Sequence, residues 1–270
     1  MLLLPRITGL ELYDPLGGGP FTRVYAGRDL TNDRRVAVKI ARDVEFADVL
    51  LQREAIVGKS VRHANLVRLR RARLSEPPGH IVYDWIEGES LRSRLQQYGR
   101  LDLRTTLWIG RQLAEALTAL HRVGFVHGDI KPDNVLVARC GSVSLIDLGF
   151  AHRPGDNASF RERGIVLGTA NYLAPELCAL DNDGDQSADL FSFGVMLFEL
   201  LTGELPYLPG DVLATLAEHR TTAARTLPDR WPSKVRQLVA SLLTRCPQRR
   251  PCASVLMLEL MRLEIRALSA

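Results

Sequence analysis

Cysteine is scarce in this sequence of 270 residues, and the four cysteines are Cys140, Cys178, Cys246 and Cys252. None of them forms a C-x-x-C pair, and no group of histidines has the spacing of metal ligands. These absences argue against a structural zinc site. Reduced thiols in a cytoplasmic protein are therefore the expectation.

Long apolar runs are also missing. The longest, Phe191–Leu201, is interrupted by two polar residues and falls far short of the roughly 20 residues that a membrane span needs. The apolar start, Met1–Leu4, ends at Pro5 and Arg6, which is too early for a signal peptide. We expect no membrane segment, and a soluble cytoplasmic protein or a soluble domain trimmed from a longer one.

Charge of one sign is not concentrated on the chain either. Hydrophobic residues make up 46% and charged residues 24%, an ordinary globular balance that argues against disorder, and the formal net charge is only +4. Arginines gather between Arg62 and Arg73, but hydrophobic residues alternate with several of them. This pattern predicts a strand with an exposed basic face, and no nucleic-acid partner is expected.

The order of predicted elements changes near residue 86. Before it, Val-rich and aromatic segments separated by turn residues predict strands at Leu10–Leu16, Phe21–Asp29, Arg35–Ala41, Leu66–Leu74 and His80–Trp85. Helical spacing predicts one helix among them, Glu45–Lys59. After it, Leu101–Arg122 has the leucine stripe of a long amphipathic helix, and the rest of the chain is mainly helical. The shift marks a boundary between two lobes.

Three adjacent glycines, Gly17, Gly18 and Gly19, follow the first predicted strand. Glycine lets the backbone approach phosphate oxygens closely and direct N–H groups at them. Taken alone, such a run is as typical of a tight hairpin. The segment from Leu16 to Val24 fits the spacing of a loop that covers phosphates, although Thr22 stands at the third glycine position.

The strand Val36–Lys39 places one lysine beside this glycine segment. A lone lysine on a strand is usually solvated, but Lys39 lies where it can contact the phosphates of a nucleotide held under the loop. A lysine in that role needs an acid to hold it. Glu54, in the following helix, is the candidate, and Glu45 is its rival.

The segment His127–Val137 carries the strongest chemical signal. Asp129, Lys131 and Asn134 cannot share one helix face, so a loop must display them. Phosphoryl transfer needs such a set: a carboxylate to orient and deprotonate a hydroxyl, a cation at the γ-phosphate, and a side-chain oxygen for Mg²⁺. A polar surface loop would not explain the apolar residues on both sides. Further on, Asp147 stands at a predicted strand end before Leu148-Gly149, as a second Mg²⁺ ligand would.

With these motifs in this order, the chain resembles the eukaryotic-type Ser/Thr protein kinases over nearly its whole length. The resemblance implies an α+β, bilobal protein-kinase fold, with a small antiparallel β-rich N-lobe that holds one main helix and a larger, mainly α-helical C-lobe. It implies one kinase domain over residues 1–270, with the N-lobe at about 1–85, the hinge at about 84–88 and the C-lobe at about 88–270. The implied activity is transfer of the γ-phosphoryl group of ATP to serine or threonine hydroxyls of protein substrates.

The resemblance also implies roles for individual residues. The implied catalytic residues are Lys39, Glu54, Asp129, Lys131 and Thr169, with Asp129 as the base. The implied ligands of Mg²⁺, or of Mn²⁺, are Asn134 and Asp147. The implied ATP-binding residues are Leu16, Gly17, Gly18, Gly19, Val24, Ala37, Lys39, Asp84, Trp85, Ile86 and Leu136, with Tyr83 behind the hinge.

Later motifs match parts of the family that a nucleotide site alone does not require. Gly168–Glu176 resembles the segment that receives a peptide substrate, where Thr169 bonds to the catalytic Asp and Lys. Asp189–Gly194 resembles the buried helix start that anchors the catalytic loop, and Arg250 resembles the late arginine that pairs with Glu176. These matches favour a protein kinase that acts on serine or threonine.

The chain departs from the family pattern at four places. Gly128 stands where an arginine is usual, Leu148 where phenylalanine is common, and Cys246 where an aspartate is usual. The connection between Lys39 and Glu54 is short, which predicts a trimmed or shifted helix. His-Gly-Asp also resembles the triplet of aminoglycoside and choline kinases, so a small-molecule phosphotransferase is an alternative. A pseudokinase scaffold is the third hypothesis.

Overall fold

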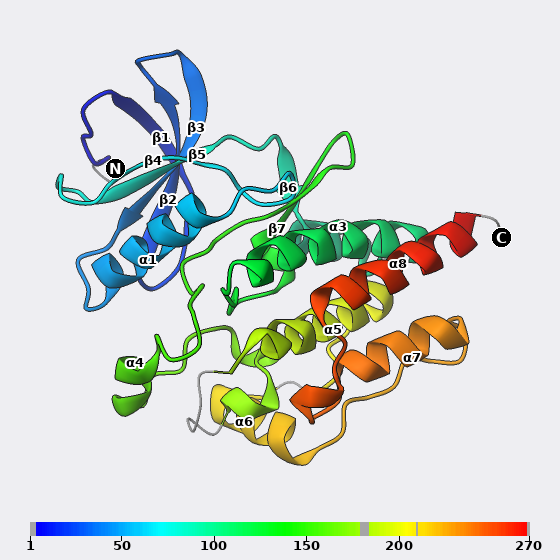
Figure 1. Cartoon of the computed structure of the whole chain (residues 1–270). Helices are drawn as coiled ribbons and strands as arrows, with labels where there is room; N and C mark the ends of the chain where they lie inside the picture. The colour runs from blue at the N-terminus through cyan, green and yellow to red at the C-terminus, as the bar shows by residue number, and fades with distance from the viewer. Residues whose placement is uncertain (1–3, 179–183, 209, 269–270) are drawn as a thin grey trace.

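The computed structural model describes residues 4–178, 184–208 and 210–268. The domain limits predicted at residues 1 and 270 lie outside the described residues, as does most of the apolar start. Figure 1 shows a β-sheet with one helix against it at the N-terminal end and a larger helical part that follows. The predicted α+β, two-lobed architecture is therefore confirmed.

The N-lobe is a five-stranded antiparallel sheet in the order β1-β2-β3-β5-β4. Its strands are β1 (Leu10–Gly18), β2 (Thr22–Asp29), β3 (Arg34–Ala41), β4 (Leu69–Arg73) and β5 (His80–Asp84). Alternate residues of β3, namely Val36, Val38 and Ile40, are buried, because successive side chains of a strand point to opposite faces. The five segments predicted to be strands in this lobe therefore contain the five observed strands or overlap with them.

The predicted strands Leu66–Leu74 and His80–Trp85 are both longer than the observed ones. β4 begins at Leu69, because Leu66 makes an isolated bridge with Leu145 of the C-lobe. β5 ends at Asp84, whose backbone N–H donates to the carbonyl of Arg68. The predicted basic face of β4 is partly neutralised, since Arg71 lies 3.0 Å from Asp29 and Arg70 also forms an ion pair.

The N-lobe helix, α1 (Ala47–Ser60), begins two residues later than predicted. Phe46 adopts a left-handed conformation, with φ of 69°, which does not continue into a helix. Leu50, Leu51 and Ala55 bury the face of α1 that packs on the sheet. The helix therefore starts after the predicted residue Glu45.

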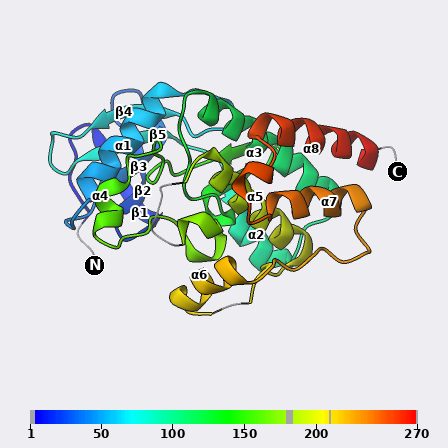
Figure 2. The same ribbon diagram turned by 60° about the horizontal axis from the view of Figure 1, so that its bottom comes forward.

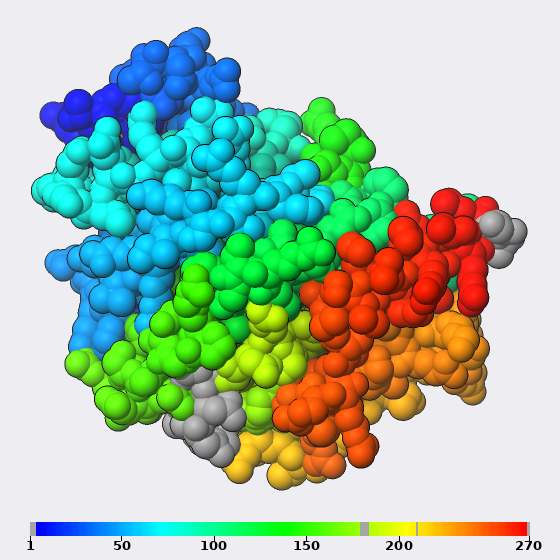
Figure 3. Space-filling view, viewed as in Figure 1, coloured from blue at the N-terminus to red at the C-terminus, as the bar shows by residue number. Residues whose placement is uncertain are grey.

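The C-lobe is mainly helical and also holds a small sheet of β6 (Gly88–Ser90), β7 (Val135–Ala138) and β8 (Val143–Leu145). Its described helices are α2 (Leu91–Tyr98), α3 (Leu103–Arg122), α4 (Ala158–Glu162), α5 (Gln186–Thr202), α6 (Val212–Thr221), α7 (Ser233–Leu242) and α8 (Ala253–Leu268). Most of α5 is buried, and α8, red in Figure 3, lies across the outer surface beside α7.

The long predicted helix begins at Leu103, two residues later than expected. Asp102 caps it: the carboxylate of Asp102 accepts the backbone N–H of Thr105 at 3.0 Å. Such a cap satisfies an N–H group that has no partner in the first turn. Among residues 4–178, 184–208 and 210–268, no helix is long and apolar enough to cross a bilayer.

Candidate active site

The carboxylate of Asp129 is held by three side chains. Thr169 donates its hydroxyl to Oδ1 at 2.7 Å, Lys131 places Nζ 2.7 Å from Oδ2, and Asn134 donates Nδ2 to Oδ2 at 2.9 Å. Lys131 also donates to the Thr169 hydroxyl at 2.7 Å, which closes a ring of contacts. Pro132 begins a short 3-10 turn, a position that proline tolerates, and the turn ends at Asn134, whose side chain reaches back to Asp129.

Asp189, at the start of α5, fixes the backbone that leads to Asp129. Its carboxylate accepts the N–H groups of His127 at 2.7 Å and Gly128 at 3.0 Å, and it meets Nε2 of His121 at 2.8 Å. Burial alone would raise the pKa of Asp189, but the bond and charge of His121 outweigh it and lower that pKa. A buried carboxylate thus anchors the loop, as the resemblance implied.

The backbone conformation requires glycine at position 128. Gly128 has φ of +79°, and a Cβ there would lie 2.8 Å from the carbonyl oxygen of Phe150. Residues other than glycine rarely adopt this backbone conformation, and a Cβ at position 128 would also collide with the backbone of Phe150. Glycine stands at the position where the family usually has arginine because the backbone there is left-handed and lies against the carbonyl of Phe150.

Lys39 holds two carboxylates in the space between the lobes. Its Nζ lies 2.7 Å from Oε2 of Glu54 and 2.6 Å from Oδ1 of Asp147. Burial disfavours the charged ammonium, but Asp147 and Glu54 outweigh this, so the pKa of Lys39 is raised. The later start of α1 does not move Glu54 away from Lys39. The rival acid, Glu45, instead forms an exposed ion pair with Arg163.

Tyr83, predicted to stand behind the hinge, has a further contact that the sequence did not indicate. Its hydroxyl donates to Oε1 of Glu54 at 2.7 Å, and its side chain is buried. Glu54 is therefore held from two sides, by Lys39 and by Tyr83.

The glycine segment is joined to Lys39 by the register of three strands. Gly17 pairs with Val24 of β2, and Val24 pairs with Lys39 of β3. The chain of the opposite strand lies so close to Gly18 that only glycine fits there: a Cβ would lie 2.5 Å from the carbonyl oxygen of Thr22. Leu16 is exposed, and nothing lies within 4 Å of a Cβ built on Gly19. The segment thus ends the sheet as an open hairpin tip.

The remaining predicted nucleotide-binding residues lie where the two sheets approach the lobe boundary. Ala37 pairs with Tyr83, and Leu136, on β7, pairs with Ser90. Both Ala37 and Leu136 are half-buried. Asp84, Trp85 and Ile86 lie between β5 and β6, and the indole N–H of Trp85 donates to Glu87 at 2.9 Å.

Asn134 and Asp147 fit a divalent cation by their donor atoms. Asn134 uses its Nδ2 on the backbone and carboxylate of Asp129, which leaves the amide oxygen as a ligand. Asp147 uses Oδ1 on Lys39 and on the N–H of Gly149, and its side chain is 42% exposed. The backbone of Ile146 donates to Asn134 at 2.9 Å, so the two segments lie together. Carboxylate and amide oxygens are the ligands that Mg²⁺ prefers.

The segment between Asp147 and Thr169 is anchored on α1, which the sequence analysis missed. It contains α4, below α1 in Figure 1 and beside it in Figure 2. Phe160 of α4 is fully buried, with its ring centre 4.6 Å from that of Phe46. Arg53, the neighbour of Glu54, donates to Oδ1 of Asn157 at 2.6 Å and lies over the Phe160 ring. Phe160 is the one large apolar residue in the polar stretch Arg153–Gly164, and this is the signal that could have indicated the anchor.

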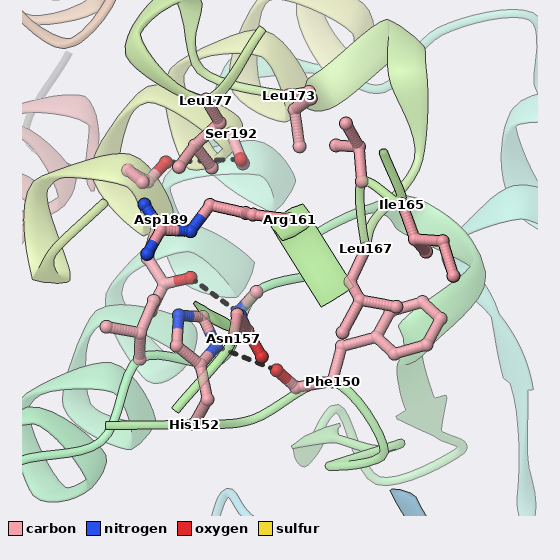
Figure 4. A pocket seen from close by; sticks show the side chains of 14 residues that line it. Phe150, His152, Asn157, Arg161, Ile165, Leu167, Leu173, Leu177, Asp189 and Ser192 are labelled. Carbon is pink, nitrogen blue, oxygen red and sulfur yellow. Dashed lines mark hydrogen bonds between the residues drawn. The ribbon is translucent and has the colours of Figure 1, made fainter. Parts of the chain in front are cut away.

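A small cavity of about 40 Å³, lined in part by Gly128, lies between the catalytic loop, α5 and this segment. Figure 4 shows the side chain of Arg161 extending across it toward Asp189. His152 and Asn157 also line the cavity. Arg161 thus brings a cation from the α4 segment to the space next to Gly128.

The predicted pair of Glu176 and Arg250 is present and bidentate. Arg250 donates to the two carboxylate oxygens of Glu176 at 2.6 and 2.8 Å. Arg250 also donates to the carbonyls of Thr244 and Ser187. Its side chain is fully buried, and that of Glu176 nearly so.

Comparisons with known proteins agree with this geometry. Residues 10–260 match the family described as protein kinase domain. The chain is 31% identical to the serine/threonine-protein kinase PrkC of Bacillus subtilis over 257 residues, 93% of this chain and 39% of the relative. It is 32% identical to the serine/threonine-protein kinase PknA of Mycobacterium tuberculosis over 242 residues, 86% of this chain and 56% of the relative. The chain spans about half the length of the curated relatives it matches.

Proposed function

The chain belongs to the protein kinase domain family, and from this premise we propose that it transfers the γ-phosphoryl group of ATP to serine or threonine hydroxyls of protein substrates. One observation carries the proposal. Asp129, Lys131 and Thr169 contact one another at 2.7 Å, next to Asn134 and on a loop anchored by Asp189. This set unites a base, a cation and a substrate-side hydroxyl.

In the proposed reaction, Asp129 accepts the proton of the substrate hydroxyl as that oxygen attacks phosphorus. Lys131, 2.7 Å from Asp129, supplies positive charge where the transferred group carries its negative charge. Thr169 bonds to both groups and so keeps base and cation in register. Because little covalent chemistry falls to the protein, positioning and electrostatics account for most of the rate.

Lys39, held by Glu54, would contact the α- and β-phosphates of ATP under the glycine segment from Leu16 to Val24. Ala37 and Leu136 would enclose the adenine, and Asp84, Trp85 and Ile86 would read its edge. Asn134 and Asp147 would hold Mg²⁺, or Mn²⁺, which neutralises phosphate charge when bound. The register that joins Gly17, Val24 and Lys39 supports this placement.

We also propose that the chain acts as one kinase domain, with lobes at about 1–85 and 88–270 joined by a hinge at about 84–88, in cytoplasmic signalling. The four cysteines are free, and three of them are exposed, which suits a reducing compartment.

The test is phosphate transfer from labelled ATP by the purified chain, with Mg²⁺ and separately with Mn²⁺. A generic basic protein and an aminoglycoside serve as alternative acceptors, and Asp129→Asn is the inactive control. Labelled phosphoserine or phosphothreonine with wild type alone supports the proposal. Transfer to the aminoglycoside alone would identify a small-molecule phosphotransferase. ATP-dependent thermal stabilisation without any transfer would identify a pseudokinase.

A further inference from the structure

Arg92, the second residue of α2, joins three separate parts of the C-lobe. Its guanidinium donates to Oε1 of Glu199 at 2.7 Å, to the hydroxyl of Tyr172 at 2.6 Å, and to Oδ2 of Asp133 at 3.2 Å. The tyrosine hydroxyl in turn donates to the other oxygen of Glu199. A guanidinium suits such a site because it presents several N–H groups in a fixed plane.

The acids around Arg92 differ in their access to solvent. The side chain of Glu199 is 9% exposed, whereas that of Asp133 is 47% exposed. Burying a carboxylate without a partner is costly, and removal of one member of a buried ion pair leaves that cost uncompensated. Without Arg92, this place would therefore be an acidic pocket in need of a cation.

The pocket lies beside the proposed phosphate-transfer centre. Asp133 stands in the catalytic loop between Lys131 and Asn134, whose side chains both contact Asp129. Tyr172 follows Thr169 by three residues and ends the 3-10 turn that begins after it. A substrate whose hydroxyl reaches Asp129 must therefore pass close to Arg92, Asp133 and Tyr172.

We propose that Arg92 is a specificity-determining residue that fills an acidic subsite of the peptide groove with the chain's own guanidinium. The kinase then does not select arginine or lysine at that substrate position. This inference rests on the proposed function, because it assigns a subsite of the same groove. Arg92 itself makes the contacts with Glu199, Tyr172 and Asp133 that a substrate cation would otherwise make.

The contacts explain why a basic substrate gains nothing in this subsite. To reach Glu199, a substrate arginine must displace Arg92 and replace its bonds with equivalent ones. The substrate side chain loses conformational freedom, and Arg92 is left without its partners. Only the exposed edge of Asp133 remains accessible, and ion pairs as exposed as this one contribute little to binding. Specificity here arises by occupying a site, not by repelling a partner.

The first experiment compares wild type, Arg92→Ala and Arg94→Ala on a peptide library with one randomised position at a time around a central serine. Arg94 is the matched control: it lies on the same helix, is similarly exposed, and pairs with Glu89 at 2.9 Å. Both variants remove one positive charge. We expect Arg92→Ala to gain at least a tenfold preference for arginine over alanine at one position, with no gain in wild type or Arg94→Ala. Unchanged preferences in Arg92→Ala would overturn the inference.

A binding measurement separates this inference from the proposed function. Isothermal titration with a tetra-arginine peptide requires no catalysis, and we expect Arg92→Ala to bind it at least tenfold more tightly than wild type or Arg94→Ala. Should Arg92→Ala fail to fold, Arg92→Gln keeps much of the side-chain volume and still removes the charge. Tight binding without phosphate transfer would refute the kinase activity and keep the subsite. Equal binding by all variants would refute the subsite even in an active kinase.

Discussion

The ring of Phe160 packs against the ring of Phe46 with 4.6 Å between their centres. Phe46 precedes α1, the helix that carries Glu54, and Phe160 belongs to the segment that runs from Asp147 to Thr169. The contact therefore joins the segment beside the substrate groove to the helix that positions Lys39. We therefore expect a change at one end to affect the other through these packed side chains.

Replacing Phe160 with alanine tests this connection. We expect Phe160→Ala to raise the KM for ATP and lower kcat several-fold, because α4 loses its buried anchor and α1 loses a support near Glu54. The melting temperature should fall less than for a core Phe→Ala change, since a short segment can detach locally. Phe160→Leu should restore most activity, and equal kinetics for the alanine variant and wild type would contradict the coupling.

Two single substitutions test the proposed nucleotide and metal residues. Asp147→Asn removes the negative charge from a proposed Mg²⁺ ligand that also pairs with Lys39, and Lys39→Met removes the proposed phosphate contact. Each should lower phosphate transfer by at least 100-fold while circular dichroism shows a folded protein. Substantial transfer by either purified variant would refute the residue assignment.

The activity should not depend on phosphorylation of the segment between Asp147 and Thr169. Its only hydroxyl is that of Ser159, which is exposed, and Gly128 offers no charge to a phosphate near the base. We expect Ser159→Ala, and wild type treated with a phosphatase, to retain turnover within a factor of ten. A larger fall, equivalent to more than about 1.4 kcal/mol in the barrier, would show that a phosphate is needed.

The pair of Glu176 and Arg250 should contribute strongly to stability. Glu176→Ala leaves the buried guanidinium without its carboxylate, and such a change costs about 3–5 kcal/mol. Glu204→Ala is the control, because its pair with Arg225 is exposed on both sides and should change stability by about 0–1 kcal/mol. Denaturant unfolding of both variants measures the difference, and equal effects would show that burial of the pair adds nothing.

Acidification between pH 7.5 and 5.5 should destabilise the chain through its buried histidines. The pKa of His219 is lowered by burial, and its Nδ1 lies 2.7 Å from the carbonyl of Leu173. The pKa of His127 is also lowered by burial. Because the unfolded histidine titrates near 6.5, the unfolded state binds more protons below that pH, and stability falls as pH falls. His219→Gln should reduce this pH dependence of the unfolding free energy, and an unchanged slope would exclude His219 as a cause.

The sequence predicted the sheet and the loop that displays Asp129, Lys131 and Asn134 because both follow from local patterns, whereas the contact of Thr169 with Asp129 was implied only by the family resemblance. The buried alternation of Val36, Val38 and Ile40 is a period-2 signal. The loop that displays Asp129 follows from spacing and from Pro132. The capping aspartate Asp102 marks the start of α3 in the sequence more accurately than the leucine stripe does, because the stripe places that start two residues too early.

The parts that were missed depend on partners far apart in the sequence. Arg92 meets Asp133, Tyr172 and Glu199 only because the fold brings α2, the catalytic loop and α5 together. No spacing rule links such positions, because each is an ordinary polar residue in its own segment. The anchor of Phe160 on α1 has the same character.

The left-handed backbone at Gly128 restricts which substitutions this kinase domain can accept. An arginine introduced there would meet the carbonyl of Phe150 at its first side-chain carbon, so that substitution alone cannot install a phosphate-sensing cation. The neighbouring loop would have to be rebuilt in the same step, and Arg161 already lines the cavity next to Gly128. A phosphorylation switch of this kind would therefore require several simultaneous substitutions in this chain. Control through contacts on α1 would require fewer changes, because those contacts are already present.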